Sequence, residues 1–180
     1  MPSLIEGYAM LGETRTAAVV NEEGSIDWTS LRWRIAPHGH PQATCRRYRG
    51  DTLVLETDFD TVEGSLRLVD FMPPRRTMPA IVRLVEGIRG RVRMNMDLRG
   101  LGHAAIAALD TVQLRTPVQT HDDGLALRAD FHVTAGELIP FVLTLHQSHE
   151  GAPAPIDPLR ALSDTESYWT ERALDSSPGY

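Results

Sequence analysis

The chain has 180 residues, of which 42% are hydrophobic and 23% are charged. These values are ordinary for a folded globular protein and exclude a chain that is disordered throughout. The formal net charge of −6 argues against nucleic-acid binding, which usually needs a basic face. The single cysteine, Cys45, excludes an internal disulfide. The start of the chain lacks the pattern of a signal peptide, and no window has the apolar length of a membrane span, so we predict a cytoplasmic protein without membrane contact.

The first two thirds of the chain predict short strands separated by turns. Residues 17–20 and 25–28, joined by a turn at Gly24, predict a hairpin. Residues 80–88 and 91–98 predict a second hairpin, with its turn near Gly87 and Gly90. Further strands are expected at residues 52–59, 64–72, 111–116, 124–133 and 137–147.

Most of these strands alternate between apolar and polar residues. Along residues 124–133, for example, Leu125, Leu127, Ala129 and Phe131 point toward one face. Many short strands, each with one apolar face, predict an all-β fold in which antiparallel sheets pack as a β-sandwich. Residues 100–110 are rich in glycine and alanine and predict either a loop or a short helical turn.

The end of the chain has a different pattern. Residues 151–158 form a proline-rich linker, and Asp157 followed by Pro158 is typical of a helix start. Leu159, Leu162 and Trp169 then recur at helical spacing and predict a C-terminal amphipathic helix of about four turns. We therefore predict a β-sandwich domain at residues 1–150 and a linker with a helix at residues 151–180.

Three carboxylates at alternate positions, Glu56, Asp58 and Asp60, are the first candidate for a catalytic site. Glycoside hydrolysis needs two carboxyl groups that face each other across a substrate. Side chains at alternate positions of one strand instead point in parallel, away from the apolar face. We interpret this row as the solvated side of a half-exposed sheet.

The other candidate sites have weaker patterns. His38, His40 and Cys45 have ligand-type side chains but lack the second close pair of a structural zinc site, so we predict no metal and no cofactor. Cys45 adjoins Arg46 and Arg47, which could lower a thiol pKa, but no catalytic partner can be assigned.

The aromatic residues Trp28, Trp33, Tyr168 and Trp169 offer a different kind of site. Their rings could contact a sugar or a neighbouring domain, and packing in a core or between domains is the preferred interpretation. The candidate contact residues, for a domain or for a sugar, are Trp28, Trp33, Leu159, Leu162 and Trp169.

Several motifs together resemble a known family. The chain opens with IEGYAMLGETRTAAVVNEEGSIDW and continues with RRYRGDTLVLETDFDT, GSLRLVDFMPPR and IVRLVEGIRGRVRMNMDLR; later come ADFHVTAGELIPFVLTLHQSH and DPLRALSDTESYW. In this order the motifs resemble the amino-terminal part of bacterial trehalase and glucoamylase-like proteins of glycoside hydrolase family fifteen. The resemblance implies a β-sandwich joined by a linker helix to an (α/α)6 barrel, which carries the catalytic glutamates. No residue of this chain matches either catalytic acid.

The chain also departs from the family pattern. The family segment that follows S-I-D-W is missing here, the sequence GLGHAAIAALD replaces the R-F-D-Y-G-like stretch that the family pattern has after M-x-L-R, and Glu13-Thr14 stands where Asp-Cys is usual. The resemblance therefore predicts a shortened domain of carbohydrate metabolism that is inactive by itself. Its expected partners are an (α/α)6 barrel, or a second copy that binds through the C-terminal helix. The alternatives are a stand-alone module that binds α-glucan or trehalose through exposed aromatics such as Trp33, and a folded remnant of a truncated enzyme.

Overall fold

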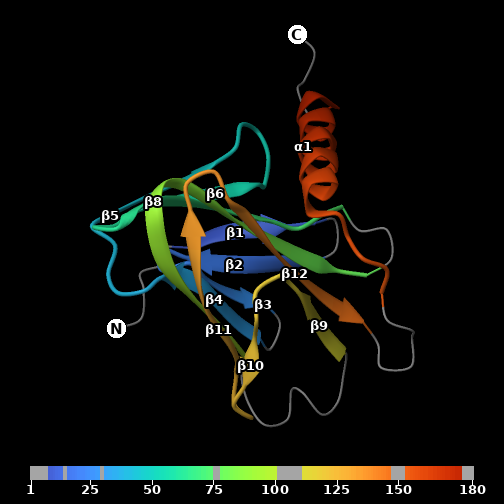
Figure 1. Ribbon diagram of the computed structural model, residues 1–180. Coiled ribbons are helices and arrows are strands. Elements are labelled where there is room, and N and C mark those ends of the chain that lie inside the picture. Colours follow the sequence, from blue (N-terminus) through green and yellow to red (C-terminus); the bar gives the residue numbers. More distant parts are fainter. Residues whose placement is uncertain are drawn as a thin grey trace.

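The structure is a computed structural model and describes residues 8–13, 16–28, 31–74, 78–100, 111–146 and 153–175. It contains antiparallel strands and one C-terminal helix, as the sequence predicts (Figure 1). The strands are β1 (Tyr8–Gly12), β2 (Ala17–Asn21), β3 (Ser25–Trp28), β4 (Leu31–Pro37), β5 (Ala43–Tyr48), β6 (Leu55–Asp60), β7 (Gly64–Phe71), β8 (Ala80–Gly100), β9 (Thr111–Arg115), β10 (His121–Asp122), β11 (Leu127–Thr134) and β12 (Leu138–His146), and the helix is α1 (Pro158–Asp175).

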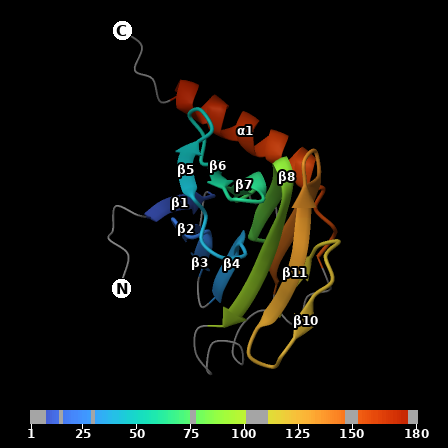
Figure 2. The same ribbon diagram turned by 60° about the vertical axis from the view of Figure 1, so that its left-hand side comes forward.

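The predicted antiparallel layers are the two halves of one strongly curled sheet. Its main path runs in the order β1-β2-β3-β4-β8-β7-β6-β5. The first part of β8 pairs with β7 and β12, and its second part pairs with β4 and β11. This 21-residue strand therefore belongs to both halves and carries the sheet around the core (Figures 1 and 2).

The prediction of a hairpin at residues 80–98 is wrong, because β8 continues through these glycines as one strand without reversing direction. A Cβ at Gly87 would lie 2.0 Å from the carbonyl oxygen of Thr134, and one at Gly90 would lie 2.2 Å from that of Glu63. Gly90 also has a positive φ of 71°. These glycines allow close approach of neighbouring backbones within a bent strand rather than a reversal of the chain.

The hairpin of β2 and β3 is confirmed. Val20 lies opposite Ile26, and the turn between them places Gly24 at a φ of 74°, a region that glycine adopts without strain. The side-chain oxygen of Asn21 accepts hydrogen bonds from the backbone N–H groups of Glu23 and Ser25. Local turn chemistry therefore explains why the chain reverses at this point.

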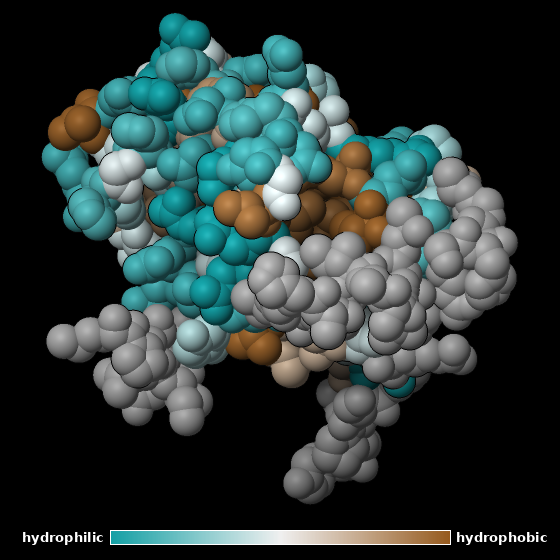
Figure 3. Space-filling view, turned by 90° about the horizontal axis from the view of Figure 1, so that it is seen from below, coloured by the Kyte–Doolittle hydropathy of each residue, from teal (hydrophilic) through white to brown (hydrophobic). Residues whose placement is uncertain are grey.

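The main core lies between the two halves of the sheet. Alternate positions of most strands contribute to it, and its largest members include Trp28, Trp33, Phe59 and Phe141. The expected inward position of Leu125 is wrong: it is 79% exposed and precedes β11. Seen from below, most of the described surface is hydrophilic, with hydrophobic side chains gathered near the centre (Figure 3).

A fully buried ion pair connects the two halves of the sheet. Arg83 on β8 donates from Nε and Nη2 to the two carboxylate oxygens of Asp70 on β7, at 2.8 and 3.1 Å. The same guanidinium donates to the carbonyl oxygens of Trp33 and Gly24, in the other half, at 2.9 and 2.8 Å. Complete burial raises the pKa of Asp70, and the guanidinium of Arg83 opposes this shift. The pair thus fixes the position of the β3–β4 strands relative to β7 and β8.

A second, smaller apolar cluster lies on the outer face of β7, β8 and β12. Val69, Phe71, Val82 and Val142 contribute to it, and α1 covers it through Ala161 (Figure 2). The helix begins as predicted, because the Asp157 carboxylate accepts the N–H groups of its second and third residues at 3.1 and 3.2 Å. The proposed division into residues 1–150 and 151–180 stays a prediction.

Candidate functional site

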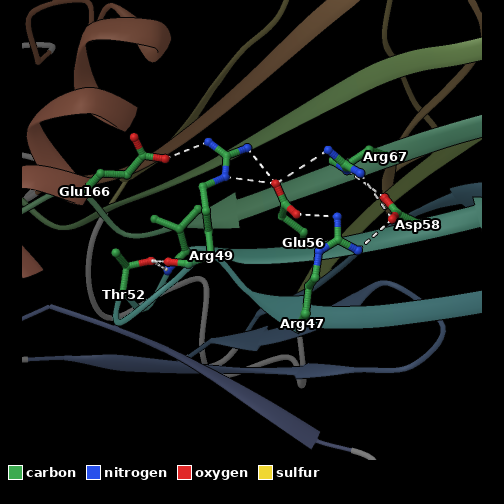
Figure 4. Close-up of polar contacts among 8 residues, drawn as sticks. Arg47, Arg49, Thr52, Glu56, Asp58, Arg67 and Glu166 are labelled. Carbon is green, nitrogen blue, oxygen red and sulfur yellow. Dashed lines mark hydrogen bonds and ion pairs between the residues drawn. The ribbon is translucent and has the colours of Figure 1, made fainter. Parts of the chain in front are cut away.

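The carboxylate row of β6 lies in a network of arginines rather than in open solvent (Figure 4). In the ladder of β5 and β6, Arg47 lies opposite Glu56, and in the ladder of β6 and β7, Arg67 lies opposite Asp58. Side chains at such positions share one face of the sheet. The order β5-β6-β7 therefore places arginines on both sides of the acidic strand.

Glu56 is the most enclosed member of this network. It is 5% exposed, which corrects the interpretation of the row as a solvated face. Its Oε1 accepts from Nε and Nη2 of Arg49 at 2.9 and 2.7 Å, and its Oε2 pairs with Nη2 of Arg47 at 2.6 Å. Nη1 of Arg67 lies 3.7 Å from Oε1. Three guanidinium groups thus compensate a carboxylate that the sheet has removed from water.

Asp58 lies beside Glu56 and is partly exposed. Its two oxygens lie 2.7 Å from Nε of Arg67 and 2.7 Å from Nη1 of Arg47. Desolvation by itself would raise the pKa of Asp58, but the hydrogen bonds from Arg67 and Arg47 outweigh it, so that the pKa lies below its ordinary value. Asp60, at the end of β6, is exposed, so only this last carboxylate of the row fits the predicted solvated face.

The network extends to the C-terminal helix through Arg49. Nη1 of Arg49 lies 2.6 Å from Oε1 of Glu166 on α1, and Figure 4 shows Arg49 between Glu166 and Glu56. The turn that carries Arg49 is fixed by Thr52, whose hydroxyl donates to the Arg49 carbonyl at 2.6 Å and accepts from the N–H of Val54 at 3.1 Å. We call the Glu56–Arg49–Glu166 contact the helix clamp, because it joins the sheet to α1.

The chemistry of this network favours a structural role over acid–base catalysis. Both oxygens of Glu56 and both oxygens of Asp58 accept from arginine. A glycosidase needs one carboxyl group that donates a proton and a second one opposite it across a substrate. The groups that face Glu56 are guanidinium groups, which donate hydrogen bonds and are always charged.

The tryptophans among the predicted contact residues lie in the core. Trp28 is 2% exposed and Trp33 is 1% exposed, so the expectation of an exposed Trp33 is wrong and the core interpretation is supported. The guanidinium of Arg83 lies 5.2 Å from the centre of a Trp33 ring. Within the described residues, the indole N–H groups of Trp28 and Trp33 have no hydrogen-bond partner.

The predicted contact residues of the helix divide between two environments. Leu162 packs against the smaller apolar cluster, Trp169 is half-buried, and Leu159 is 56% exposed. The most buried positions of α1 are Ala161 and Thr165, which sequence analysis missed. Residues four apart lie on the same side of a helix, so the spacing of Ala161 and Thr165 could have indicated the buried side of α1. Alanine and threonine contribute little to a hydrophobic pattern, however, and larger apolar residues dominated the prediction.

The candidate metal and thiol sites contain no enclosed cluster. His38 and His40 are exposed, and Cys45 is a free, exposed thiol on β5. Among the described residues, no group of three or more His, Cys, Asp or Glu side chains could hold a metal ion. Residues 101–110, within the segment predicted to form a loop or a short helical turn, lie outside the described part of the chain. None of the helices in that described part is long and apolar enough to span a membrane.

Comparison with known proteins does not add a family to this geometry. A scan against models of protein families gives no match, and a search of curated proteins gives none either. The functional argument therefore depends on the curled sheet, the helix clamp and the motifs of the sequence.

Proposed function

We propose that this chain is a non-catalytic domain that positions a separate helical domain through α1. The proposal follows the resemblance to the amino-terminal domain of trehalase and glucoamylase-like proteins, in which a linker helix leads to an (α/α)6 barrel. The observation that carries it is the helix clamp, in which Arg49 joins Glu56 of the sheet to Glu166 of α1. A helix held by both an ion-pair network and an apolar cluster has a defined direction, which a domain attached to it would need.

The absence of catalytic activity in this proposal follows from the state of the carboxylates. The carboxylates of Glu56 and Asp58 already form ion pairs with arginines. The resemblance assigns the catalytic glutamates to a barrel outside this sequence. Incubation of the chain with trehalose, maltose and starch is expected to release no glucose above a blank. Release of glucose that disappears in the Glu56→Gln variant would contradict the proposal, since it would place catalysis in the network.

The positioning role is tested by binding in trans. If a reading frame for an (α/α)6 barrel lies directly downstream of this chain, the purified barrel is expected to bind the wild-type chain in sedimentation experiments. The variant Arg49→Met, which breaks the clamp, should bind more weakly, while Arg32→Met, at an exposed ion pair with Asp27, should bind like the wild type. Equal binding of the barrel by the wild type, Arg49→Met and Arg32→Met would show that the helix clamp does not position the barrel.

The alternative of a carbohydrate-binding module receives no specific support from the described residues. Such modules stack aromatic rings on sugar rings, but Trp28 and Trp33 are enclosed by the core. Saturable heat on titration with α-glucans would favour this alternative. A remnant of a truncated enzyme, in turn, predicts that an interrupted barrel sequence follows downstream.

A further inference from the structure

The hairpin of β3 and β4 carries three buried polar side-chain atoms that have no hydrogen-bond partner among the described residues. They are the hydroxyl oxygen of Ser25 and the indole N–H groups of Trp28 and Trp33. The three residues are 7%, 2% and 1% exposed, in this order. Buried polar groups in proteins nearly always have a partner, because a buried group without one has lost its hydrogen bonds to water. Their concentration on one hairpin therefore needs a physical explanation.

The two indoles lie on the same face of this hairpin. In the ladder of β3 and β4, Trp28 lies opposite Leu31, and Trp33 lies opposite Ile26. Because Trp33 follows Leu31 by two residues, the tryptophans are diagonal neighbours on one face, at a spacing that aromatic side chains can bridge. Both belong to the main core, whereas Ser25 lies on the other face of β3. The indoles are therefore the two groups that can share one partner.

A second, independent observation is that the same core contains unused acceptor capacity. The guanidinium of Arg83 lies 5.2 Å from the centre of a Trp33 ring and donates to both oxygens of Asp70. Among the described contacts, each of these carboxylate oxygens accepts one hydrogen bond, although such an oxygen can accept two. Asp70 is fully buried, so bulk water does not supply the missing donors. Unpaired donors and unused acceptors thus lie in one enclosed part of the core.

We propose that this core binds an ordered water molecule that accepts from the indole N–H groups of Trp28 and Trp33 and donates to the Asp70 carboxylate. A cation does not fit, because indole N–H groups only donate hydrogen bonds, and an anion does not fit beside a buried carboxylate. Water both accepts and donates, and three hydrogen bonds are typical of a buried water. The water extends the connection between the two halves of the sheet, and this inference does not depend on the positioning role of α1.

A crystal structure of the whole chain, at a resolution that shows ordered water, tests the geometry of this site. We expect a density peak between about 2.5 and 3.2 Å from both indole nitrogens and from one oxygen of Asp70. In solution, the indole protons of Trp28 and Trp33 should show direct rotating-frame Overhauser cross-peaks to water. The absence of the density peak, or a peak that contacts only one of the two indoles, would overturn the shared site.

The energetic test replaces one tryptophan at a time with benzothienylalanine, in which sulfur takes the place of the indole N–H and the shape is nearly kept. At Trp28 or Trp33 the water loses one hydrogen bond, so the unfolding equilibrium constant in urea titrations should rise about fivefold. Trp169 on α1 is half-buried and is the matched control, with an expected change of less than about twofold. An indole N–H without any partner predicts the opposite sign, because its removal stabilises the fold. A lower unfolding constant for the replacement at Trp28 and at Trp33 would therefore refute the water site.

Discussion

The hydroxyl of Tyr48 binds both backbone groups of Met10, and this contact joins the two ends of the main sheet path. The hydroxyl donates to the Met10 carbonyl and accepts from the Met10 N–H, each at 2.8 Å. Tyr48 ends β5 and Met10 lies in β1, the last and first strands of the path. One side chain thus takes the place that a neighbouring strand would occupy beside Met10, and it covers part of an open edge.

Removal of this hydroxyl should weaken the fold and free the edge of β1. In Tyr48→Phe we expect a loss of about 1–2 kcal/mol in the free energy of unfolding, because two hydrogen bonds are lost. We also expect self-association that depends on concentration, measured by sedimentation velocity. Tyr8→Phe is the matched control, since Tyr8 is equally exposed, at 38%, and its hydroxyl has no hydrogen-bond partner within the described residues. Equal behaviour of the two variants would contradict this role of Tyr48.

The buried pair of Asp70 and Arg83 should be far more sensitive than a surface pair. Arg83→Met leaves an uncompensated buried carboxylate and should lower the free energy of unfolding by about 3–5 kcal/mol in urea titrations. The double variant Asp70→Leu/Arg83→Met should recover much of this loss, because no buried charge remains. Arg32→Met, at an exposed pair with Asp27, should cost less than about 1 kcal/mol. Similar losses for Arg83→Met and Arg32→Met would show that the buried pair is not a structural connection.

Acid should destabilise the protein through carboxylates whose pKa is lowered in the folded state. Hydrogen bonds from Arg99 and then from Arg128, opposed by partial burial, lower the pKa of Asp97, and Asp58 is lowered by its own arginines. Their unfolded pKa is near 3.8. The stability that they contribute is therefore fully present above that pKa and is lost as the pH falls through the lower folded values.

Urea unfolding between pH 7 and pH 2 measures this effect. The double variant Asp58→Asn/Asp97→Asn cannot titrate at these positions, so its stability should fall less steeply in acid than that of the wild type. If the two chains lose stability in parallel over this range, the acid sensitivity comes from other groups.

The glycines of β8 should be less tolerant than glycines at open turns. Gly90 and Gly124 both have positive φ values, 71° and 80°, so alanine is strained at either position by about 1 kcal/mol. At Gly90 the added Cβ also meets the Glu63 carbonyl at 2.2 Å, whereas nothing lies within 4 Å at Gly124. Gly90→Ala should therefore lower the melting temperature clearly more than Gly124→Ala. The reverse order would contradict the close approach of the backbones in this bend.

The helix clamp should control the local stability of α1. Arg49→Met removes the contact with Glu166 and leaves Glu56 with fewer partners, so amide hydrogen exchange in α1 should become faster. Exchange in β8, within the core, should change less. Arg172→Met is a control on the helix itself, since Arg172 contacts Tyr168 on the same helix. Faster exchange in both variants alike would mean that helix propensity, and not the clamp, holds α1.

Local patterns in the sequence determined much of the secondary structure. Alternation of apolar and polar residues predicted most strands, the glycine at position 24 predicted a turn, and Asp157 with Pro158 predicted the helix start. Each of these features depends on a few consecutive residues, so it can be seen without knowledge of neighbours in space. The glycines of β8 failed as turn signals, because the backbones that approach them belong to Glu63 and Thr134.

Tertiary structure alone decided the character of the acidic row. The sequence placed Glu56 and Asp58 on the polar face of a strand, and their location on that face is what the structure shows. Whether such a face is wet or enclosed depends on the register of β5 and β7 and on Glu166, which is 117 residues away from Arg49. The free energy of a charge is set by the groups around it in space. The spacing of residues along one strand predicts the face on which a side chain lies, but it does not predict which groups surround that side chain.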